Sequence, residues 1–496
     1  MLPAIDAGNG RFKIAVPDST GNPKLLMTLS GQPFFTSVAY FEKGGSIIIG
    51  SEAENAALAN PQRAVFDWKR EMGTDKILYT DDDGKTYIPP DILAIFLGEC
   101  KNIIESKTGH VANDVVILIP ANYNDKQKQQ TIDAAGRVGI NVELLAHEPT
   151  CAALGNDIHK KRNCRALVFD PGAGTFDVSI VQSAGNMFEV IATGGEPQLG
   201  SRDFNRRATD KVLDEFEAKF NYRPTPDEHP VFCQNLAQQV EQLKISLSAQ
   251  KQFHLVVTCR GDLLKMTITR EQFESWIKDL VEQTIQRTEV TVKEAKLEWF
   301  DIDEIYAVGG GSMTPLVIQM LEQASSKKVS QRCEAHSAAA LGGVIAGRLE
   351  YQRKGKAYNI GDVTLPPPDF YMREILSRSI GIVVLDQNDR EICWEMLAKN
   401  TRIPSIQTRT FKMSDAHQTQ VFIKVLDGEH GAEVDECVEL GNFELTNLPP
   451  RPDLISRVEI TFHLDANGML IATARDIVSG KTAELKIAYK DKVEAA

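Results

Sequence analysis

The sequence predicts an α/β region of two related halves, followed by an antiparallel β domain. Short apolar runs alternate with helix-like segments as far as about Gly347, which is typical of α/β domains. Two Asp-Gly turns of the same kind lie far apart within that region. Beyond residue 372, apolar and polar residues alternate one by one, which favours antiparallel strands. A chain of 496 residues is also too long for a single core.

The paired turns are the strongest signal in the first region. Asp6 ends one apolar run and Asp170 ends another, 164 residues later. Each aspartate is followed by two glycines and a second apolar run, so each motif reads as strand, tight turn, strand. Glycines let backbone N–H groups approach a phosphate, and a carboxylate at a strand end can hold a hydrated metal ion. The pair predicts a nucleotide cleft shared by two halves, with turn glycines at Gly8, Gly10, Gly172 and Gly174.

Other elements of this region follow from periodicity and capping. Val115–Pro120 is predicted as a buried strand, with a helix over Asp125–Val138. Helices are also predicted over 203–220 and 234–247, which are rich in good helix formers. Ile305–Val308 is predicted as a strand that runs through a glycine turn into a helix from about Pro315.

The composition changes after Leu349. Residues 351–371 contain Gly355, Gly361 and three consecutive prolines at 366–368, and are predicted to form a linker. The division expected is therefore 1–350, a linker over 351–371, a β domain over 372–490 and a tail over 491–496. The β strands expected are 421–426, 444–445, 458–464, 470–474 and 483–489.

Charge and composition exclude several classes of protein. The net charge of −13 argues against a nucleic-acid partner, because nucleic acids attract basic surfaces. No apolar run approaches the roughly 20 residues needed to cross a bilayer. No basic and apolar leader opens the chain, so we expect no membrane contact and a cytoplasmic location. The eight cysteines form no Cys-x-x-Cys pair, which indicates reduced thiols rather than a disulfide framework or a zinc site.

The absence of two common motifs excludes two types of phosphate site. No Gly-x-x-x-x-Gly-Lys-Ser/Thr motif is present, and the turn at 172–174 lacks the third glycine of a dinucleotide fingerprint. Hydrolysis of a bound nucleotide needs a metal, a cation beside the γ-phosphate and a carboxylate that orients water. Lys69 and Glu148 are candidates for the last two roles, although their spacing alone is that of ordinary surface charges.

Seven segments together favour a catalytic role for Lys69 and Glu148 over that of ordinary surface charges. The chain resembles the heat-shock protein 70 (DnaK-type) chaperone family in order and over nearly its whole length. The segments that carry the resemblance are Val116–Asp125, His147–Leu154, Leu167–Val181, Leu199–Phe204, Ala307–Ser312, Ala398–Pro404 and Val425–Glu429. The resemblance implies an actin-like ATPase of two lobes over 1–350 and a peptide-gripping β-sandwich over about 372–490.

The resemblance also implies roles at the phosphate end of the cleft. Asp6 and Asp170 match carboxylates that hold Mg²⁺ through its waters, and Asp177 matches a partner of a K⁺ site. Lys69 and Thr175 match residues beside the γ-phosphate, and Glu148 matches a carboxylate used in hydrolysis and in coupling between lobes. The catalytic set implied is thus Lys69, Glu148, Asp170 and Thr175. Phosphate contacts are implied for Asp6, Gly8, Asn9, Gly10, Gly172, Ala173, Gly174, Gly200 and Ser201.

The adenosine and peptide sites are implied in the same way. The family's adenosine-contacting residues match Glu241, Lys244, Ser248, Gly309, Gly310, Gly311 and Met313. In the β domain, Phe411 matches a pocket-wall phenylalanine and Val421 an apolar residue of the central peptide pocket. Alternating Val and Phe are also what any sandwich core contains, so these two positions have an equally simple structural interpretation.

The nucleotide site departs from the family pattern at several positions. Asn9 and Gly10 replace two threonines, which removes two hydroxyls but leaves backbone N–H groups accessible. Met313 replaces an arginine that stacks on adenine, so affinity is expected to fall by roughly 1 kcal/mol. Ala173 replaces a glycine, and its Cβ would crowd the phosphate if its φ were positive. Arg202 replaces an acidic residue.

Three further departures concern the chaperone cycle. The linker carries Pro366–Met372 where the family has an acidic residue and a leucine run, although docking through 370–372 is still possible. Leu144 replaces a basic residue that engages J-domain partners. We expect no helical lid, because the sequence ends within seven residues of Tyr489. Without a lid a bound peptide is expected to leave quickly.

The function expected is that of an ATP-dependent, chaperone-like protein. ATP or ADP, Mg²⁺ and K⁺ are the cofactors implied, and extended polypeptides, a J-domain protein and a nucleotide-exchange factor are the partners. An alternative is a nucleotide-regulated module that recognises one specific partner. A small-molecule kinase and a filament-forming protein on the same actin-like fold are more remote alternatives.

Overall fold

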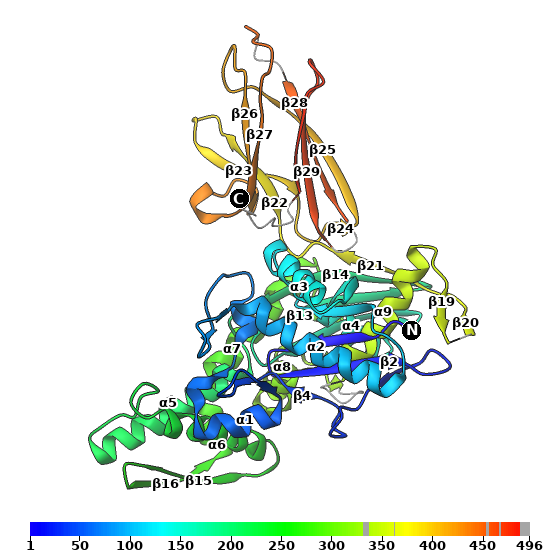
Figure 1. The fold of residues 1–496 in the computed structure, drawn as a ribbon. Helices are drawn as coiled ribbons and strands as arrows, with labels where there is room; N and C mark the ends of the chain where they lie inside the picture. Colours follow the sequence, from blue (N-terminus) through cyan, green and yellow to red (C-terminus); the bar gives the residue numbers. More distant parts are fainter. Residues whose placement is uncertain (331–336, 362, 453–455, 466–467, 487–496) are drawn as a thin grey trace. The chain divides into compact units, whose positions relative to one another are not determined.

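The computed structural model describes residues 1–330, 337–361, 363–452, 456–465 and 468–486. These form two compact units (Figure 1). The first unit comprises 1–121, 130–188 and 193–372, and the second comprises the residues from 373 onward with the short segments 122–129 and 189–192. The predicted tail, 491–496, lies outside the described residues.

The first half of the first unit is built on a mixed sheet. Its main strands follow the order β11-β10-β1-β2-β3, and a further short strand, β4, pairs with β2. β1 lies parallel to β10 and antiparallel to β2, and β10 lies parallel to β11. The bounds are β1 Ala4–Ala7, β2 Arg11–Pro17, β3 Pro23–Leu25, β4 Phe35–Thr36, β10 Asp114–Ile119 and β11 Asn141–His147.

The second half repeats this plan. Its strands follow the order β18-β17-β12-β13-β14, with β12 antiparallel to β13 and parallel to β17, and β17 parallel to β18. The bounds are β12 Asn163–Pro171, β13 Phe176–Ala184, β14 Met187–Glu196, β17 Glu304–Ala307 and β18 Val329–Ser330. The hairpins β1–β2 and β12–β13 therefore occupy equivalent places, and each carries one of the Asp-Gly turns.

Two helices, α4 (Glu148–Gly155) and α9 (Ala338–Arg353), pack tightly against each other in the first unit. Their close approach depends on glycine. A Cβ at Gly342 would lie 1.7 Å from the carbonyl oxygen of Cys151, and one at Gly155 would lie 2.0 Å from that of Ala338. Since α4 begins at Glu148, this packing holds a candidate catalytic residue in place.

We expect Gly342→Ala to destabilise the first unit by about 3 kcal/mol, because the added methyl group meets rigid backbone rather than a movable side chain. Urea unfolding followed by circular dichroism measures the effect. Gly136→Ala is the matched control: Gly136 lies in a helix, α3 (Asp125–Arg137), and a Cβ there meets nothing within 4 Å. The control should be neutral or stabilising, since alanine favours helix. Equal stability of the two variants would contradict the prediction.

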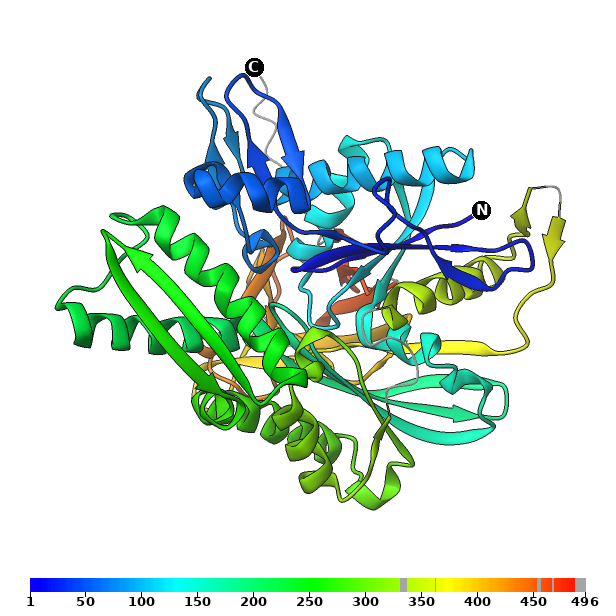
Figure 2. The ribbon, with the colours of Figure 1, turned by 90° about the horizontal axis from the view of Figure 1, so that it is seen from below.

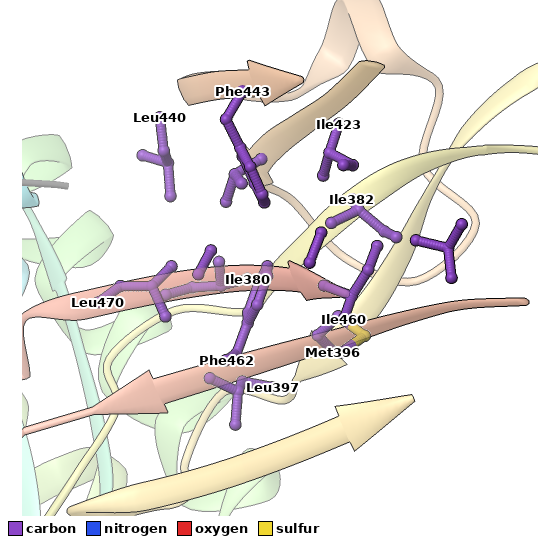
Figure 3. Packing of buried hydrophobic residues seen from close by; sticks show 14 of the residues in the cluster. Ile380, Ile382, Met396, Leu397, Ile423, Leu440, Phe443, Ile460, Phe462 and Leu470 are labelled. Atoms are coloured by element: carbon purple, nitrogen blue, oxygen red, sulfur yellow. The ribbon is translucent and has the colours of Figure 1, made fainter. Parts of the chain in front are cut away.

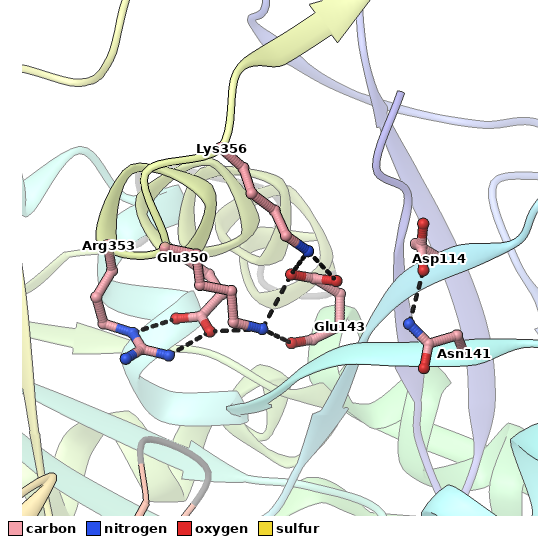
Figure 4. A network of polar contacts seen from close by, with 7 residues as sticks. Asp114, Asn141, Glu143, Glu350, Arg353 and Lys356 are labelled. Carbon is pink, nitrogen blue, oxygen red and sulfur yellow. Dashed lines mark hydrogen bonds and ion pairs between the residues drawn. The ribbon is translucent and has the colours of Figure 1, made fainter.

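An ion-pair network joins the end of α9 to β11 (Figure 4). The Lys354 ammonium donates to Glu143 Oε1 at 3.0 Å, and that of Lys356 donates to the same oxygen at 2.9 Å. Glu350 accepts from Arg353 at 2.6 and 2.7 Å. Burial alone would raise the pKa of Glu143, but the two lysines prevail and lower it. Glu143 is therefore held ionised at neutral pH.

The remaining helices of the first unit belong mainly to its second half. A long hairpin, β15 (Gln252–Cys259) and β16 (Asp262–Thr269), packs beside α6 (Pro230–Ala249) (Figure 2). The predicted helices over 203–220 and 234–247 are confirmed as parts of α5 (Ser201–Phe220) and α6. The other helices are α1 Ser51–Ala59, α2 Pro89–Thr108, α7 Arg270–Glu294 and α8 Pro315–Ser325.

Short elements complete this unit. The strands β5 (Ala39–Phe41), β6 (Ile47–Ile49) and β7 (Ala64–Val65) form a small sheet, and β8 (Tyr79–Thr80) pairs with β9 (Thr86–Tyr87). In the part of the chain that the structure describes, no helix combines the length and apolar character needed to span a membrane.

The stretch predicted as a linker, 351–371, contains ordered local structure. α9 extends to Arg353, and β19 (Tyr358–Ile360) pairs with β20 (Val363–Leu365) in an antiparallel hairpin. Further on, Phe370 is buried and stacks on His159, with ring centroids 4.6 Å apart. Burial lowers the pKa of His159, so its ring is neutral at neutral pH.

The second unit is a β-sandwich. One sheet has the order β23-β22-β26-β27 and the other β25-β28-β29-β30. Apolar residues of both sheets share one core, among them Ile382 and Phe443 from the first sheet and Ile460 and Phe462 from the second (Figure 3). The strands of the two sheets are β22 Ile380–Leu385, β23 Glu391–Leu397, β25 Ser405–Lys412, β26 Val421–Asp427, β27 Val438–Leu445, β28 Ser456–Leu464, β29 Leu470–Asp476 and β30 Thr482–Lys486. Outside these two sheets, β21 (Tyr371–Ile375) pairs with β24 (Arg402–Ile403).

The strand predictions in this unit agree with β26, the end of β27, β28 and β29. The strand expected at 483–489 is confirmed from Ala483 to Lys486, and its last three residues lie outside the described part.

Candidate functional site

The two Asp-Gly turns of the first unit face each other directly. A Cβ at Gly174 would lie 2.5 Å from Asn9 Nδ2, and one at Gly10 would lie 3.1 Å from the Cβ of Ala173. Larger side chains at either glycine would push the turns apart. The equivalent hairpins of the two halves thus bring the two turns to one place.

Two further predicted segments lie against the second turn. The Ser201 N–H donates to the Gly172 carbonyl at 2.9 Å, and a Cβ at Gly200 would lie 2.5 Å from the Ala173 carbonyl oxygen. Gly309 has a positive φ of 72°, and a Cβ there would lie 2.1 Å from Asp170 Oδ1. Glycine is therefore required at 309 both by conformation and by its approach to a candidate metal-binding carboxylate.

Ala173 causes no backbone strain. The φ of Ala173 is not positive. Crowding of the phosphate by the Ala173 Cβ was expected only at a positive φ, so it is not expected here. Replacement of the family glycine by alanine is compatible with the local backbone at this position.

Buried carboxylates gather beside the turns. Asp170 and Asp177 are paired directly across the β12–β13 hairpin, whereas at the equivalent place of the β1–β2 hairpin Asp6 faces Lys13. The Lys13 ammonium lies 2.6 Å from Asp6 Oδ2. The pKa of Asp170 is raised well above its ordinary value by burial and by the charges of Glu148, Asp177 and Asp6. The second hairpin thus sets one carboxyl group directly opposite another, where the first sets a carboxyl group opposite a lysine.

Asp177 supports the fit of a cation here. Burial and the charge of Glu148 raise the pKa of Asp177 to about 7, although Thr175 Oγ1 donates to its Oδ2 at 3.0 Å. The other oxygen, Oδ1, is buried without a hydrogen-bond partner. An uncompensated carboxylate oxygen in a buried acidic cluster is suited to a hard cation or its water.

The mode of metal binding is constrained by the spacing of these groups. Among the described residues, no three His, Cys, Asp or Glu side chains are arranged to ligate one ion directly. Mg²⁺ dehydrates reluctantly and usually keeps several waters, so carboxylates can hold it without converging on it. Asp6, Asp170 and Asp177 fit that indirect mode, which is the one the resemblance implies.

Lys69 and Glu148 form a buried ion pair. Lys69 lies in a short 3₁₀ helix, η2 (Trp68–Glu71), and Glu148 is the first residue of α4, directly after β11. The Lys69 ammonium donates to Glu148 Oε1 at 2.7 Å, and the two side chains are only 9% and 14% exposed. Because Glu148 also acts on the pKa of Asp170 and Asp177, this pair belongs to the same electrostatic cluster.

The sequence analysis missed the pair Arg70–Asp203. Arg70 Nη2 lies 2.5 Å from Asp203 Oδ2, and Arg70 Nε donates to the Gly174 carbonyl at 3.0 Å. The same Asp203 oxygen accepts from the Gly200 N–H at 2.8 Å. Arg70 therefore ties the second turn to the start of α5. In the sequence, the position of Arg70 next to Lys69 was the one feature that could have indicated this role.

We expect Arg70→Ala to weaken ATP binding by about tenfold, since a charge-assisted hydrogen bond that orders the second turn is lost. Isothermal titration calorimetry with a non-hydrolysable ATP analogue and Mg²⁺ measures the change. Arg207→Ala is the control, because Arg207 makes a similar forked pair with Asp279 on the surface of α5 and α7. An unchanged affinity in Arg70→Ala would contradict the role given to this side chain.

The residues predicted for adenosine form a chain along α6. Lys244 Nζ lies 3.0 Å from Glu241 Oε2, and Ser248 Oγ donates to the Lys244 carbonyl at 3.0 Å. Burial lowers the pKa of Lys244. Gly310 and Gly311 lie with Met313 in a 3₁₀ turn, η5 (Gly310–Met313), where the Met313 side chain is about half exposed.

Arg202 connects α6 to the phosphate end. It forms an ion pair with Asp67, and burial lowers its pKa despite the charges of Glu241, Glu54 and Asp203. Asn205 also donates to Glu241. The arginine that departs from the family pattern is thus surrounded by acidic side chains, which compensate for its positive charge.

The predicted peptide-site residues lie at the margin of the sandwich core. Phe411 on β25 and Val421 on β26 are each partly buried and pack against that core. The Phe411 ring also meets Trp394 edge to face, with centroids 6.5 Å apart. Leu144, in contrast, belongs to the first unit and is buried in β11 at 5% exposure.

One comparison with known proteins bears on identity. A family model described as Hsp70 protein matches residues 4–496, which is essentially the whole chain. Proteins of this family are chaperone-type ATPases that bind ATP or ADP with Mg²⁺. The chain is accordingly a chaperone-type ATP-binding protein and belongs to the Hsp70 family.

Proposed function

We propose that this protein hydrolyses ATP to ADP and phosphate and binds extended apolar polypeptide segments through its β-sandwich. The observation that carries the first part is the buried Lys69–Glu148 pair, 2.7 Å long, beside an acidic cluster and two facing glycine turns. A buried ion pair is costly to desolvate and is weak evidence of a purely stabilising role. Its position next to a phosphate-binding arrangement favours a catalytic one.

Each group has a distinct task in the proposed reaction. The turns at 8–10 and 172–174 present N–H groups to the phosphates, and Asp6 and Asp170 hold the waters of Mg²⁺. When bound, Mg²⁺ neutralises charge on the phosphate oxygens. Lys69 stabilises the negative charge on the γ-phosphate, Thr175 lies beside that phosphate, and Glu148 orients the attacking water. Asp177 is suited to a K⁺ ion through its unpartnered Oδ1.

The adenosine moiety is assigned to Glu241, Lys244, Ser248 and the turn at 309–313. Met313 supplies dispersion but no cation–π attraction, so modest nucleotide affinity is part of this proposal. We expect the protein to bind one ATP and to hydrolyse it slowly.

Peptide binding is proposed for the surface around Phe411 and Val421. Both side chains reach from the core toward solvent, and Trp394 adds an aromatic face beside Phe411. An extended peptide would add backbone hydrogen bonds and insert one apolar side chain, a mode that suits many sequences weakly.

Single-turnover ATP hydrolysis with and without an extended apolar peptide tests both parts. Hydrolysis that is accelerated by peptide is the expected result. Fluorescence anisotropy of the labelled peptide should show weaker binding to Val421→Ser than to Phe422→Ser, because the neighbouring Phe422 is 55% exposed and lies on the other face of β26. Peptide affinity that is equal in the two variants would rule out the site.

A second candidate is a nucleotide-regulated module with one specific partner. The observation that favours it is the burial of Leu144, which offers no basic group to a J-domain protein. In that case ATP hydrolysis would be indifferent to generic peptides and to an added J-domain protein or nucleotide-exchange factor. Broad binding to denatured proteins would exclude this candidate.

A further inference from the structure

Two cysteine thiols lie together in the second unit, outside the sites described above. Cys393 is on β23, and Cys437 directly precedes β27. The Cys393 thiol donates to the Gly428 carbonyl and the Cys437 thiol to the Glu433 carbonyl, both at 3.4 Å, so the two thiols border the same short segment. Both sulfurs also border Gly428: a Cβ there would lie 2.3 Å from Cys437 Sγ and 3.5 Å from Cys393 Sγ. Glycine leaves the space in which the thiols meet.

A second glycine opens space on the other side of Cys393. A Cβ at Gly381, on the neighbouring strand β22, would lie 2.7 Å from Cys393 Sγ. Glycine at 381 and 428 thus leaves room for the two sulfur atoms. Both cysteines are free in the structure, with Cys393 buried and Cys437 partly exposed.

Residues 431–433, in the segment that leads to Cys437, run along the edge of β23. The Cys393 N–H donates to the Ala432 carbonyl, and the Gly431 N–H donates to the Cys393 carbonyl, both at 2.9 Å. Ile392 and Glu433 form an antiparallel bridge. These backbone contacts hold segment 428–437 against β23. Cys437 is the last residue of that segment.

We propose that Cys393 and Cys437 form a reversible disulfide by exchange with a small-molecule disulfide such as oxidised glutathione, and that this bond fastens segment 428–437 to β23. The proposal is carried by two thiols from segments far apart in the sequence whose sulfur atoms both lie beside Gly428. The backbone contacts of Ile392 and Cys393 with residues 431–433 already hold the two segments side by side, which a disulfide requires.

The exchange proceeds in two balanced steps. Cys437, the more accessible thiol, loses its proton to water and attacks one sulfur of the small disulfide, which releases one thiolate. Cys393 then loses its proton and attacks Cys437 Sγ, which forms the protein disulfide and releases a second thiolate. The two thiolates take up the two protons, so one disulfide is reduced as one is formed. Burial raises the pKa of the Cys393 thiol to about 12, which is consistent with its acting second.

The bond has a local structural consequence. Segment 428–437 carries His430, whose ring meets Trp394 edge to face at a centroid distance of 4.8 Å. Trp394 in turn meets Phe411. Fastening the segment would hold Trp394 beside Phe411. If the proposed peptide function is correct, oxidation should slow peptide dissociation, on the order of fivefold.

Peptide mapping of the full-length protein tests the disulfide itself. The folded protein is incubated with oxidised glutathione, remaining thiols are alkylated, and the chain is cut with a glutamyl endopeptidase. Exposed Glu433 and Glu436 give cleavage sites on the N-terminal side of Cys437. We expect a linked peptide that contains Cys393 and Cys437, is two hydrogen atoms lighter than the sum of its parts, and separates on reduction.

Two variants make the result decisive. The linked peptide should disappear in Cys437→Ser and persist in Cys233→Ser, which alters a partly exposed thiol of the first unit. A folded wild-type protein that yields only a glutathione adduct on Cys437, or no modification there, would overturn the proposal. Peptide dissociation is measured separately on both redox forms. Absence of peptide binding in both forms would count against the proposed function, while the mapping result still decides the disulfide.

Discussion

Replacing Lys69 by alanine is expected to lower single-turnover ATP hydrolysis by about 100-fold or more while ATP binding changes little. The Lys69 charge is buried and directed by Glu148, so it acts in a site where solvent screens it poorly. Loss of one such group that stabilises transition-state charge typically costs about 3 kcal/mol in the activation free energy. Quenched-flow measurement of phosphate release gives the rate, and calorimetry gives the affinity.

A neighbouring lysine provides the control for this prediction. Lys76 pairs with Glu71 at 2.7 Å but is 59% exposed, so Lys76→Ala should hydrolyse ATP at the wild-type rate. Glu148→Gln should also slow hydrolysis, because a neutral amide polarises the attacking water less than a carboxylate does. Hydrolysis at the wild-type rate in Lys69→Ala would remove the main support for the proposed reaction.

The Asp476→Asn substitution is expected to destabilise the second unit by about 3 to 5 kcal/mol. Asp476 and Arg457 form an ion pair with 0% and 2% exposed side chains, and Asp476 Oδ1 lies 2.5 Å from Arg457 Nε. Asparagine has nearly the same shape but removes the carboxylate charge that pairs with the buried guanidinium. Urea unfolding followed by the fluorescence of Trp394 measures the change in this unit.

The pH dependence of the free energy of unfolding should also reflect the Arg457–Asp476 ion pair. Burial alone would raise the pKa of Asp476, but hydrogen bonds from Arg457 and Ser479 lower it below its ordinary value. A carboxyl whose pKa is lower in the folded state stabilises the protein above the ordinary pKa, and this stability is lost as the pH falls toward the folded-state value. Stability should therefore fall with acidification below about pH 4 in wild type and less steeply in Asp476→Asn.

Exposed Asp415 supplies the comparison within the same unit. Asp415→Asn should change the free energy of unfolding by less than about 0.5 kcal/mol, as is usual for surface substitutions. If both asparagine variants were equally stable, the buried pair would have to contribute no more than a surface aspartate.

Local patterns were sufficient for most elements of the fold. Alternation of apolar residues identified the strands of the sandwich, and helix-forming composition identified most of α5 and α6. The turns at Asp6 and Asp170 predicted two related halves, and the two sheets have the same strand order. The assignment of roles to Lys69 and Glu148, however, rested on resemblance to the family, because their spacing carried no chemical signal.

The sequence by itself determined most strands of the sandwich, the helices α5 and α6, the paired turns and the resemblance to the family. The tertiary structure alone decided which side chains meet: Arg70 with Asp203, Arg457 with Asp476, and Cys393 with Cys437. It also decided that Leu144 is buried and that the predicted linker contains a hairpin. The reason is physical. Periodicity and turn chemistry depend on near neighbours in the chain, whereas these contacts depend on strand register and helix packing that bring distant residues together.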